Sequence, residues 1–352
     1  MPPSLAGFRA LAFDGKKLKY VVKRLKPLRG LKGNVYGGKL LIVQDMATGQ
    51  AVAAEAAVDG EAADNPLVPE AVVRVRAGAD ARARLWVGDR AFCDLQILPL
   101  LSAAGDHFVV RYHAKCHFHA DSAVAARTGI DDVGREYREQ WGWLGAADHP
   151  GRSRVRRITV ARPTDGPLVL VTSLIDADRY PAFDLLGLYR GRWGIETMFQ
   201  QVVQTFDLRH LIGGSAQATV FQAIFCLLVH NITLIVRDHV AAGAERAAAT
   251  VSLRLLFDDL VRDLTAWMEV IGPNATAEVL AATTFASAAD LRSFLERTLG
   301  GVWTKRWVKQ KTRKRPPKKP PRAYLRGGHS SVDRILRRVH KEIPIRPRKQ
   351  SQ

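Results

Sequence analysis

Apolar and polar positions alternate over the first part of the chain in the way that short strands and helices produce. The pattern predicts strands at residues 8–15, 37–49 and 51–60, a helix at 65–78, a strand at 84–92, a helix at 94–105 and a strand at 107–114. Asn65 and Pro66 are placed to cap and to begin the first of these helices. Three strands followed by alternating helices and strands indicate a mixed α/β sheet with helices on its faces.

Residues 115–178 are more polar and carry strand-like segments. Strands are expected at residues 135–145, 153–163 and 166–176. After them, one helix is expected to begin near Pro181 and to run through residues 183–206. The chain therefore places a β-rich segment between the first sheet and this helix.

A long apolar helix is predicted at residues 216–239. A membrane span is one interpretation, because about 20 apolar residues suffice to cross a bilayer. Polar side chains such as His230 and Asn231 interrupt the apolar run, which favours a helix buried against the sheet. Further helices are expected at residues 252–272 and 288–300, the second with Ser287 as its cap.

Positive charge is concentrated near the C-terminus. Residues 301–352 carry 18 Lys and Arg against two acids, a net charge of +16, and the whole chain of 352 residues carries +19. A second basic strip, free of acids, lies at residues 16–32. Such clusters indicate a polyanionic partner, because neutralising phosphates releases counterions. A solvated tail is the alternative for the C-terminal segment, whose Pro/Lys-rich part, 309–328, should be flexible.

The overall composition narrows the class of protein. A hydrophobic content of 47% excludes wholesale disorder. The three cysteines show no CxxC spacing, which excludes a disulfide framework and favours a reducing compartment. The N-terminus lacks the pattern of a secretory signal, and the chain has no phosphate-binding loop, so a cytoplasmic protein without a nucleotide cofactor is expected.

Two aspartates are expected where strands end, the place where open α/β sheets position reactive groups. Asp14 closes the first predicted strand and Asp89 closes the fourth. Taken singly, each fits a turn or a helix cap equally well.

A third candidate group lies on the helix after the β-rich segment. Tyr189, Arg192 and Glu196 are spaced i, i+3 and i+7, so they share one helix face. Arg offers a fork to phosphate oxygens and Glu offers a hard oxygen ligand. A solvated face with an Arg–Glu pair is the alternative.

Together, Asp14, Asp89 and Glu196 predict a metal site of carboxylates. Such a site suits two Mg²⁺ or Mn²⁺ ions about 4 Å apart, which stabilise the attacking and leaving oxygens of a phosphodiester displacement. A zinc site at His113, His117 and His119, with Cys116 nearby, is a weaker alternative because clear ligand pairs are missing.

The segments DGKKLK, GDRAF and YRGRWGIETMFQ resemble the catalytic motifs of DDE transposases of bacterial insertion sequences. The similarity is greatest to the insertion-sequence-four group, with its Y-x2-R-x3-E-x6-K signature, and extends over residues 8–240. The resemblance implies a ribonuclease-H-like fold interrupted by a β-rich insertion before the glutamate helix. The implied division is a first core part at 8–114, the insertion at 115–178, core completion at 179–240, helices at 241–300 and a basic tail at 301–352.

The resemblance also implies roles for individual residues. Asp14, Asp89 and Glu196 become the catalytic, metal-binding triad. Tyr189 and Arg192 contact the DNA backbone near the cleaved end, and Trp193 supports an unstacked base. Trp141 or Trp143 is a candidate partner aromatic, although core packing is favoured for both. Lys16, Lys17 and Arg209 add basic contacts to DNA.

Two departures from the family pattern stand out. The signature lysine should fall at position 203, which is Val203, and Gln200 occupies a position that is often basic in relatives. Arg209 and the basic strip are expected to compensate, unless this branch holds DNA differently or the copy is impaired. Asp14 also lies close to Met1, so a preceding DNA-end recognition domain is expected to be missing or located elsewhere.

The sequence as a whole predicts a metal-dependent transposase that cleaves DNA at transposon ends and transfers strands into target DNA, without ATP. A homodimer on DNA is expected, because two ends must be held together. Two alternatives remain open: a ribonuclease-H-like nuclease without strand transfer, and a decayed transposase that only binds DNA.

Overall fold

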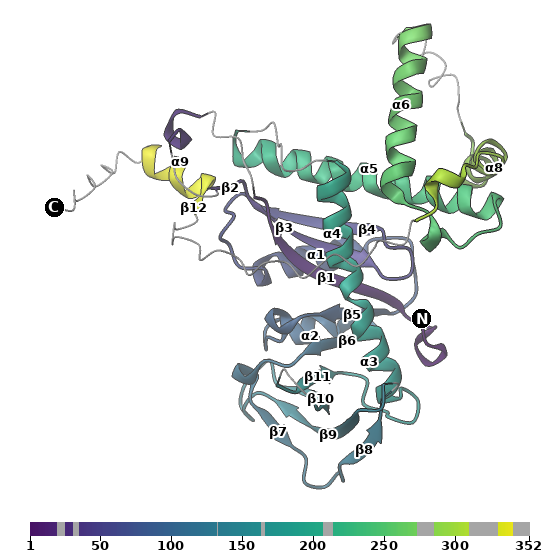
Figure 1. Cartoon of the computed structure of the whole chain (residues 1–352). Helices are drawn as coiled ribbons and strands as arrows, with labels where there is room; N and C mark the ends of the chain where they lie inside the picture. The colour runs from purple at the N-terminus through teal and green to yellow at the C-terminus, as the bar shows by residue number, and fades with distance from the viewer. Residues whose placement is uncertain are drawn as a thin grey trace. The chain divides into compact units, whose positions relative to one another are not determined.

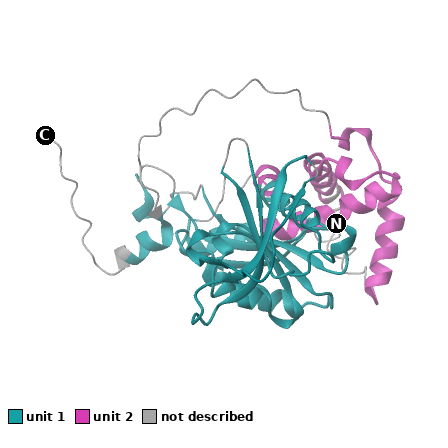
Figure 2. Cartoon of the chain, turned by 90° about the horizontal axis from the view of Figure 1, so that it is seen from below, with its two compact units in different colours: residues 1–199, 209–224, 328–352 teal, residues 200–208, 225–327 magenta. Residues whose placement is uncertain are grey.

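The computed structural model describes residues 1–19, 25–30, 35–131, 133–162, 166–206, 214–272, 285–309 and 330–340. The chain divides into two compact units, drawn in different colours in Figure 2. Unit 1 comprises residues 1–199, 209–224 and 328–352, and unit 2 comprises residues 200–208 and 225–327.

Unit 1 is built on a ten-stranded mixed sheet (Figure 1). Its strands are β1 (Arg9–Lys17), β3 (Lys39–Asp45), β4 (Ala51–Ala57), β5 (Arg84–Gly88), β6 (His107–Arg111), β7 (Phe118–Ala120), β8 (Arg127–Ile130), β9 (Glu136–Leu144), β10 (Ser153–Val160) and β11 (Leu168–Thr172). The short β2 (Val35–Tyr36) pairs outside this sheet.

The first five strands of the sheet lie in the order β4-β3-β1-β5-β6. The β1–β3 and β3–β4 pairs are antiparallel, while β1–β5 and β5–β6 are parallel. Three antiparallel strands followed by two parallel additions on the side of the first strand form the ribonuclease-H-like arrangement. The predicted fold class is therefore confirmed.

The strands predicted in the β-rich segment are present as β9, β10 and β11. They continue the same sheet, because β11 pairs antiparallel with β6 and is followed by β10, β9 and β7. The segment thus extends the edge of the core sheet beyond β6.

Alternation along the strands fills both faces of the sheet. Trp86 packs on one face with α1 (Val68–Arg76) and α2 (Ile97–Leu101), in a cluster that also holds Leu11, Phe13, Phe92, Leu98 and Phe108. Leu85 and Val87 point to the other face, which α3 (Ala182–Gly191) covers. The helix predicted from Asn65 begins later, since residues Asn65–Leu67 form a 3₁₀ turn and Leu67 is the cap of α1.

The helix expected over residues 183–206 is divided in two. It consists of α3 and α4 (Trp193–Thr205), and Arg192 lies at the break. The Arg192 and Ile195 amides each donate to a carbonyl three residues back, at 3.1 Å. A Cβ at Gly191 would lie 3.1 Å from Met46 Cε, so the glycine lets the chain pass close to the end of β3. The expectation of one helix was wrong, since α3 ends at Gly191 and α4 begins at Trp193.

Unit 2 contains helices around a small core. Most of α5 (Ala216–Gly243) belongs to it, with α6 (Leu253–Ile271), α8 (Ala288–Leu299) and a 3₁₀ turn at Lys305–Trp307. The core residues are Val240, Ala241, Val251, Leu256 and Trp307. The Trp307 indole donates to Asp259 at 2.8 Å, and the predicted cap Ser287 accepts from the Asp290 amide at 3.1 Å.

The long apolar helix α5 is only partly buried. His230 and Thr233 are buried, whereas Leu228 is 54% and Ile232 is 52% exposed. The expectation that this helix is buried against the sheet was therefore wrong, since its periodicity does not define which neighbour covers each face. By length and composition alone α5 is long and apolar enough to cross a membrane, and 33% of its most apolar window is buried.

Part of the basic C-terminal segment packs onto unit 1. The two-residue strand β12 (Ser330–Ser331) pairs with β2 in parallel and leads into α9 (Val332–His340). Val332 is fully buried with Leu28 and Val35. Arg334 forms ion pairs of 2.8 Å with Asp59 and Glu61. The predicted flexibility of 309–328 concerns residues that, apart from Lys309, lie outside the described chain.

Candidate active site

Asp14 and Asp89 lie side by side on adjacent parallel strands. In the register of β1 and β5, Ala12 is opposite Val87, and two residues further along both chains are Asp14 and Asp89. Asp89 follows the end of β5 as predicted, and its Oδ1 accepts a hydrogen bond from the Ala91 amide at 2.7 Å. Asp14 lies inside β1, which continues to Lys17, so the prediction that Asp14 ends its strand was wrong.

Glu196 comes from the first turn of α4, directly after the helix break. Arg192 is buried, with 7% of its surface exposed. Its Nη2 donates to Glu196 Oε1 at 3.4 Å, and its Nε has no hydrogen-bond partner among the described residues. The guanidinium carbon lies 5.7 Å from the ring centroids of both Tyr189 and Trp193. The predicted Tyr–Arg–Glu face therefore persists across the break.

The electrostatics of Asp14 connect it to both other carboxylates. Burial, then the charge of Asp89 and, to a smaller extent, that of Glu196 raise the pKa of Asp14 from 3.8 to about 6. Arg192 and the Gly15 amide act in the opposite direction. A carboxyl that is repelled by two neighbours has an environment suited to a cation.

Tyr189 connects these charges to a residue that the sequence analysis missed. Burial raises the pKa of its hydroxyl, and Arg192, Arg111 and Asp89 all act on it electrostatically. Arg111 ends β6, and in the register of β5 and β6 the position opposite Arg111 is that of Asp89. Little in the sequence pointed to Arg111, because the predicted strand 107–114 continued past it, whereas β6 ends there.

The predicted basic contacts differ in how the structure places them. Lys16 is exposed, and its Nζ lies 5.0 Å above the Phe199 ring, which connects β1 to α4. Lys17 is exposed with its Nζ 5.0 Å from the Tyr36 ring. Arg209 lies outside the described residues.

The three tryptophans considered as base-stacking candidates differ in how far they are exposed. Trp193 is 60% exposed beside Arg192 and is available to a partner. Trp141 is buried, and its indole donates to the Ile175 carbonyl at 2.8 Å, so the favoured packing role is confirmed for Trp141. Trp143 is covered by Arg152, whose guanidinium carbon lies 4.3 Å from its ring centroid.

The fit of a metal ion rests on donor chemistry. Three carboxylates are hard oxygen ligands of the type that Mg²⁺ and Mn²⁺ prefer. In the described chain no three His, Cys, Asp or Glu side chains are positioned together as a finished metal site, and this applies equally to the zinc alternative at His113, His117 and His119. One oxygen each of Asp14, Asp89 and Glu196 is engaged by Gly15, Ala91 and Arg192 respectively.

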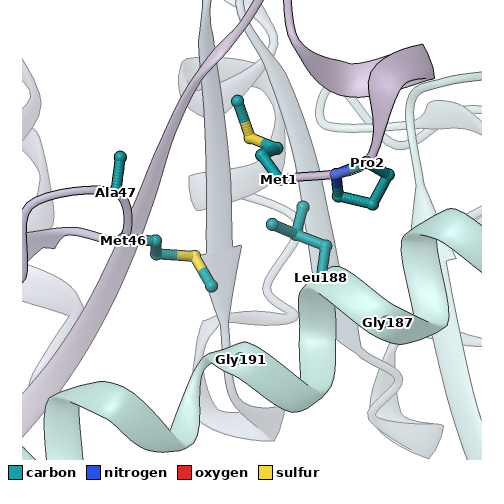
Figure 3. Close-up of a pocket in the computed structure, with 7 residues that line it drawn as sticks. All are labelled: Met1, Pro2, Met46, Ala47, Gly187, Leu188 and Gly191. Atoms are coloured by element: carbon teal, nitrogen blue, oxygen red, sulfur yellow. The ribbon is translucent and has the colours of Figure 1, made fainter. Parts of the chain in front are cut away.

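An apolar pocket of about 380 Å³ lies next to the helix break, on the side where Gly191 passes β3. Figure 3 shows Leu188 of α3 directed towards Met1, with Met46 reaching towards Gly191. The side chains that line it carry no ionisable group, so they offer no acid–base chemistry.

Comparison with known proteins identifies the family of this arrangement. Residues 9–232, which include the two aspartates, the glutamate and the arginine at the break, match the family described as Transposase DDE domain. The chain belongs to this family. A protein of Sinorhizobium fredii whose name describes it as transposase y4zB is 30% identical over 107 residues, which are 30% of this chain and 27% of that protein. The chain thus spans about a quarter of that relative.

A solved structure is also similar to this DDE-family chain. It is a piggyBac transposase synaptic complex with hairpin DNA, with a TM-score of 0.43 and 12% sequence identity. The match covers 83% of this chain and 57% of that one.

Proposed function

We propose that Asp14, Asp89 and Glu196 form the catalytic triad of a metal-dependent transposase. The observation that carries this proposal is the raised pKa of Asp14, caused by burial and by the charges of Asp89 and Glu196. Carboxylates with only structural roles are usually compensated by cations or amide donors. The charge here is only partly compensated, by Arg192 and the Gly15 amide, which favours a site that receives divalent cations.

The three carboxylates would hold two Mg²⁺ or Mn²⁺ ions, which when bound polarise the scissile phosphate and lower the pKa of water. Arg192, whose buried Nε has no described partner, orients a phosphate oxygen of the DNA. Tyr189 directs its hydroxyl to the same backbone. Exposed Trp193 stacks on an unpaired base at the cleaved end, and Lys16 and Lys17 contact neighbouring phosphates, with Arg209 in the same role.

The reaction is phosphodiester hydrolysis followed by transesterification. Water attacks the phosphorus at a transposon end, the bond to the 3′ oxygen breaks, and a free 3′-hydroxyl results. That hydroxyl attacks a phosphodiester of the opposite strand, which joins the two strands in a hairpin and releases the flanking DNA with a 3′-hydroxyl. A second water opens the hairpin and restores the 3′-hydroxyl of the transposon end, which then attacks a phosphodiester of the target DNA and releases a 3′-hydroxyl there. Each transesterification conserves the number of phosphodiester bonds, so no ATP is required.

The partners follow from this chemistry. DNA ends and target DNA are the substrates, and a second copy of the chain holds the other end, so we propose a homodimer on DNA. A cytoplasmic protein associated with DNA is consistent with these partners. The net charge of +19 supports a polyanionic partner in general, but it does not distinguish transposon ends from target DNA or a monomer from a dimer.

The test compares Asp89→Ala and Glu196→Ala with Asp178→Ala, a carboxylate that is 82% exposed and lies in a loop. The two site variants should lose divalent-dependent nicking of duplex DNA, and the control should keep it. Pre-cleaved ends should also yield joined products with the parent protein. Nicking without joining would identify the nuclease alternative, and equal nicking by all variants would show that the triad is wrong.

A further inference from the structure

A cavity with a polar lining, separate from the apolar pocket beside Gly191, lies in unit 1 at the end of the sheet that holds the proposed triad. It has a volume of about 450 Å³. It is lined by the loop after β5, the segment after β6, the start of the 3₁₀ turn before α1 and the turn between β9 and β10. The polar side chains that matter here are Asn65, Asp94, Gln96, His113, Lys115 and His149.

This cavity adjoins the proposed triad, but Asp14, Asp89 and Glu196 are not among its lining residues. Ala91 lines the cavity, and its amide donates to the Asp89 carboxylate at 2.7 Å. The loop that contains Ala91 therefore contacts both the cavity and the Asp89 carboxylate. A DNA strand whose scissile phosphate lies at Asp89 has further phosphates within reach of the cavity, since successive phosphates lie only several ångströms apart.

The two histidines are fixed as hydrogen-bond donors. His113 Nδ1 accepts from the Lys115 amide at 3.1 Å, and His149 Nδ1 accepts from the Gly151 amide at 3.0 Å. An imidazole that accepts at Nδ1 carries its proton at Nε2. Both rings therefore offer an N–H, to which the Lys115 ammonium and the amide groups of Asn65 and Gln96 add further donors.

Asp94 is the acid among these lining groups, and its role is local. Its Oδ1 accepts from the Gln96 amide at 2.8 Å, and its carbonyl accepts from the Ile97 and Leu98 amides at 3.0 and 2.9 Å. The residue therefore organises the start of α2. Removing its charge while keeping the acceptor is possible with asparagine, which makes the sign of its effect on an anion measurable.

We infer that this cavity is a subsite for a backbone phosphate of DNA, bound by Lys115 together with the Nε2–H groups of His113 and His149. The inference rests on the proposed function only in taking DNA as the ligand. A phosphate offers several acceptor oxygens and no donor at neutral pH, which matches a cavity rich in donors. Contacts of this type fix the position of a duplex and do not depend on its sequence.

The experiment measures the binding of a labelled duplex of arbitrary sequence, in EDTA, as a function of salt. The slope of log K against log salt should become shallower by about one unit in Lys115→Ala, because one phosphate contact is lost. The matched control is Arg82→Ala, at the opposite end of β5, where Arg82 pairs with Asp80 at 2.7 Å. The control should keep the parent slope.

Two further variants make the result specific. His113→Ala combined with His149→Ala should weaken binding several-fold while leaving the salt slope almost unchanged, because the loss of neutral donors changes no counterion release. Asp94→Asn should bind the duplex as tightly as the parent or more tightly. Melting temperatures of all variants report whether each remains folded, and Arg82→Ala provides the comparison for a lost surface charge.

Clear outcomes would overturn the inference. Weaker binding by Asp94→Asn would indicate that the cavity takes a hydrogen-bond donor such as a base edge. Equal slopes for Lys115→Ala and the parent, with Lys115→Ala abolishing binding of inorganic phosphate or pyrophosphate, would assign the cavity to a small phosphorylated ligand. These measurements need no metal and no cleavage, so a failure of the proposed reaction leaves their result interpretable.

Discussion

The two ends of the central strands treat their carboxylates in opposite ways. Asp106, just before β6, is 1% exposed and is surrounded by donors. It accepts from Arg76 Nε at 2.9 Å, the Arg84 amide at 2.9 Å and the Trp86 indole at 3.2 Å. Asp14, at the other end, has the charge of Arg192, one amide donor and two repelling carboxylates, and its pKa is raised to about 6.

This difference separates a structural aspartate from the one proposed to bind a metal ion. Buried charges are tolerated when hydrogen bonds and counter-charges surround them, as at Asp106. A carboxylate left in repulsion lowers the stability of the protein without its ligand, and such strain is typical of functional sites. The sequence shows an aspartate beside a strand at both ends, and only the neighbours in space distinguish the two.

The largest effect is expected from Asp106→Ala. This change leaves the Arg76 and Arg84 guanidinium groups without their carboxylate in a buried setting and removes the acceptor of the Trp86 indole. The free energy of unfolding should fall by about 3 to 5 kcal/mol. Urea unfolding followed by tryptophan fluorescence measures it, and a loss below about 1 kcal/mol would remove the contrast between the two ends.

Asp14→Asn should have the opposite sign. A shift of the Asp14 pKa from 3.8 to about 6 corresponds to an ionised form that is destabilised by up to about 3 kcal/mol in the folded protein. Without divalent metal the variant should be more stable than the parent by about 1 to 3 kcal/mol at neutral pH. Added Mg²⁺ should raise the melting temperature of the parent and leave that of the variant nearly unchanged.

His230 tests whether a shift caused mainly by burial, with one like charge nearby, produces a similar penalty. Burial, followed by the charge of Arg237, lowers the pKa of His230 from 6.5 to about 4. The folded state then binds fewer protons than the unfolded chain between these values, so stability should be lost as pH falls through this window, by up to about 3 kcal/mol. His230→Leu should flatten this part of the stability profile, and hydrogen exchange in α5 provides the measurement.

The smallest effect concerns the pair of Arg192 and Glu196. Arg192 donates to Glu196 at 3.4 Å and partly compensates the carboxylates. Removing this positive charge in Arg192→Gln should tighten Mn²⁺ binding by roughly three- to tenfold while DNA affinity falls. Paramagnetic resonance of free Mn²⁺ measures the first change. Arg127→Gln, an exposed residue paired with Asp178, serves as the control, and weaker Mn²⁺ binding by Arg192→Gln would contradict the proposed roles.

Much of the sheet was accessible from the sequence because its strands carry strong local patterns. Leu85, Trp86 and Val87 predict a strand buried on both faces, and Asp89 is the first polar residue after it. The helix break at Arg192 was not predicted, because the helical pattern of residues 183–206 continues through this position. The cavity at Lys115 was not predicted either, because Asn65 and His149 reach it from segments that are distant in the sequence.

The pairing of β12 with β2 has a consequence for how the protein is made. Gly60 donates its amide to Ser331, 271 residues further along the chain. Leu28 and Val35 acquire Val332 as their buried neighbour only after the rest of the described chain before it has been synthesised. Synthesis proceeds from the N-terminus, so Leu28 and Val35 lack this buried neighbour until Val332 has been translated. A chain that ends before Ser330 therefore leaves β2 without its partner strand β12.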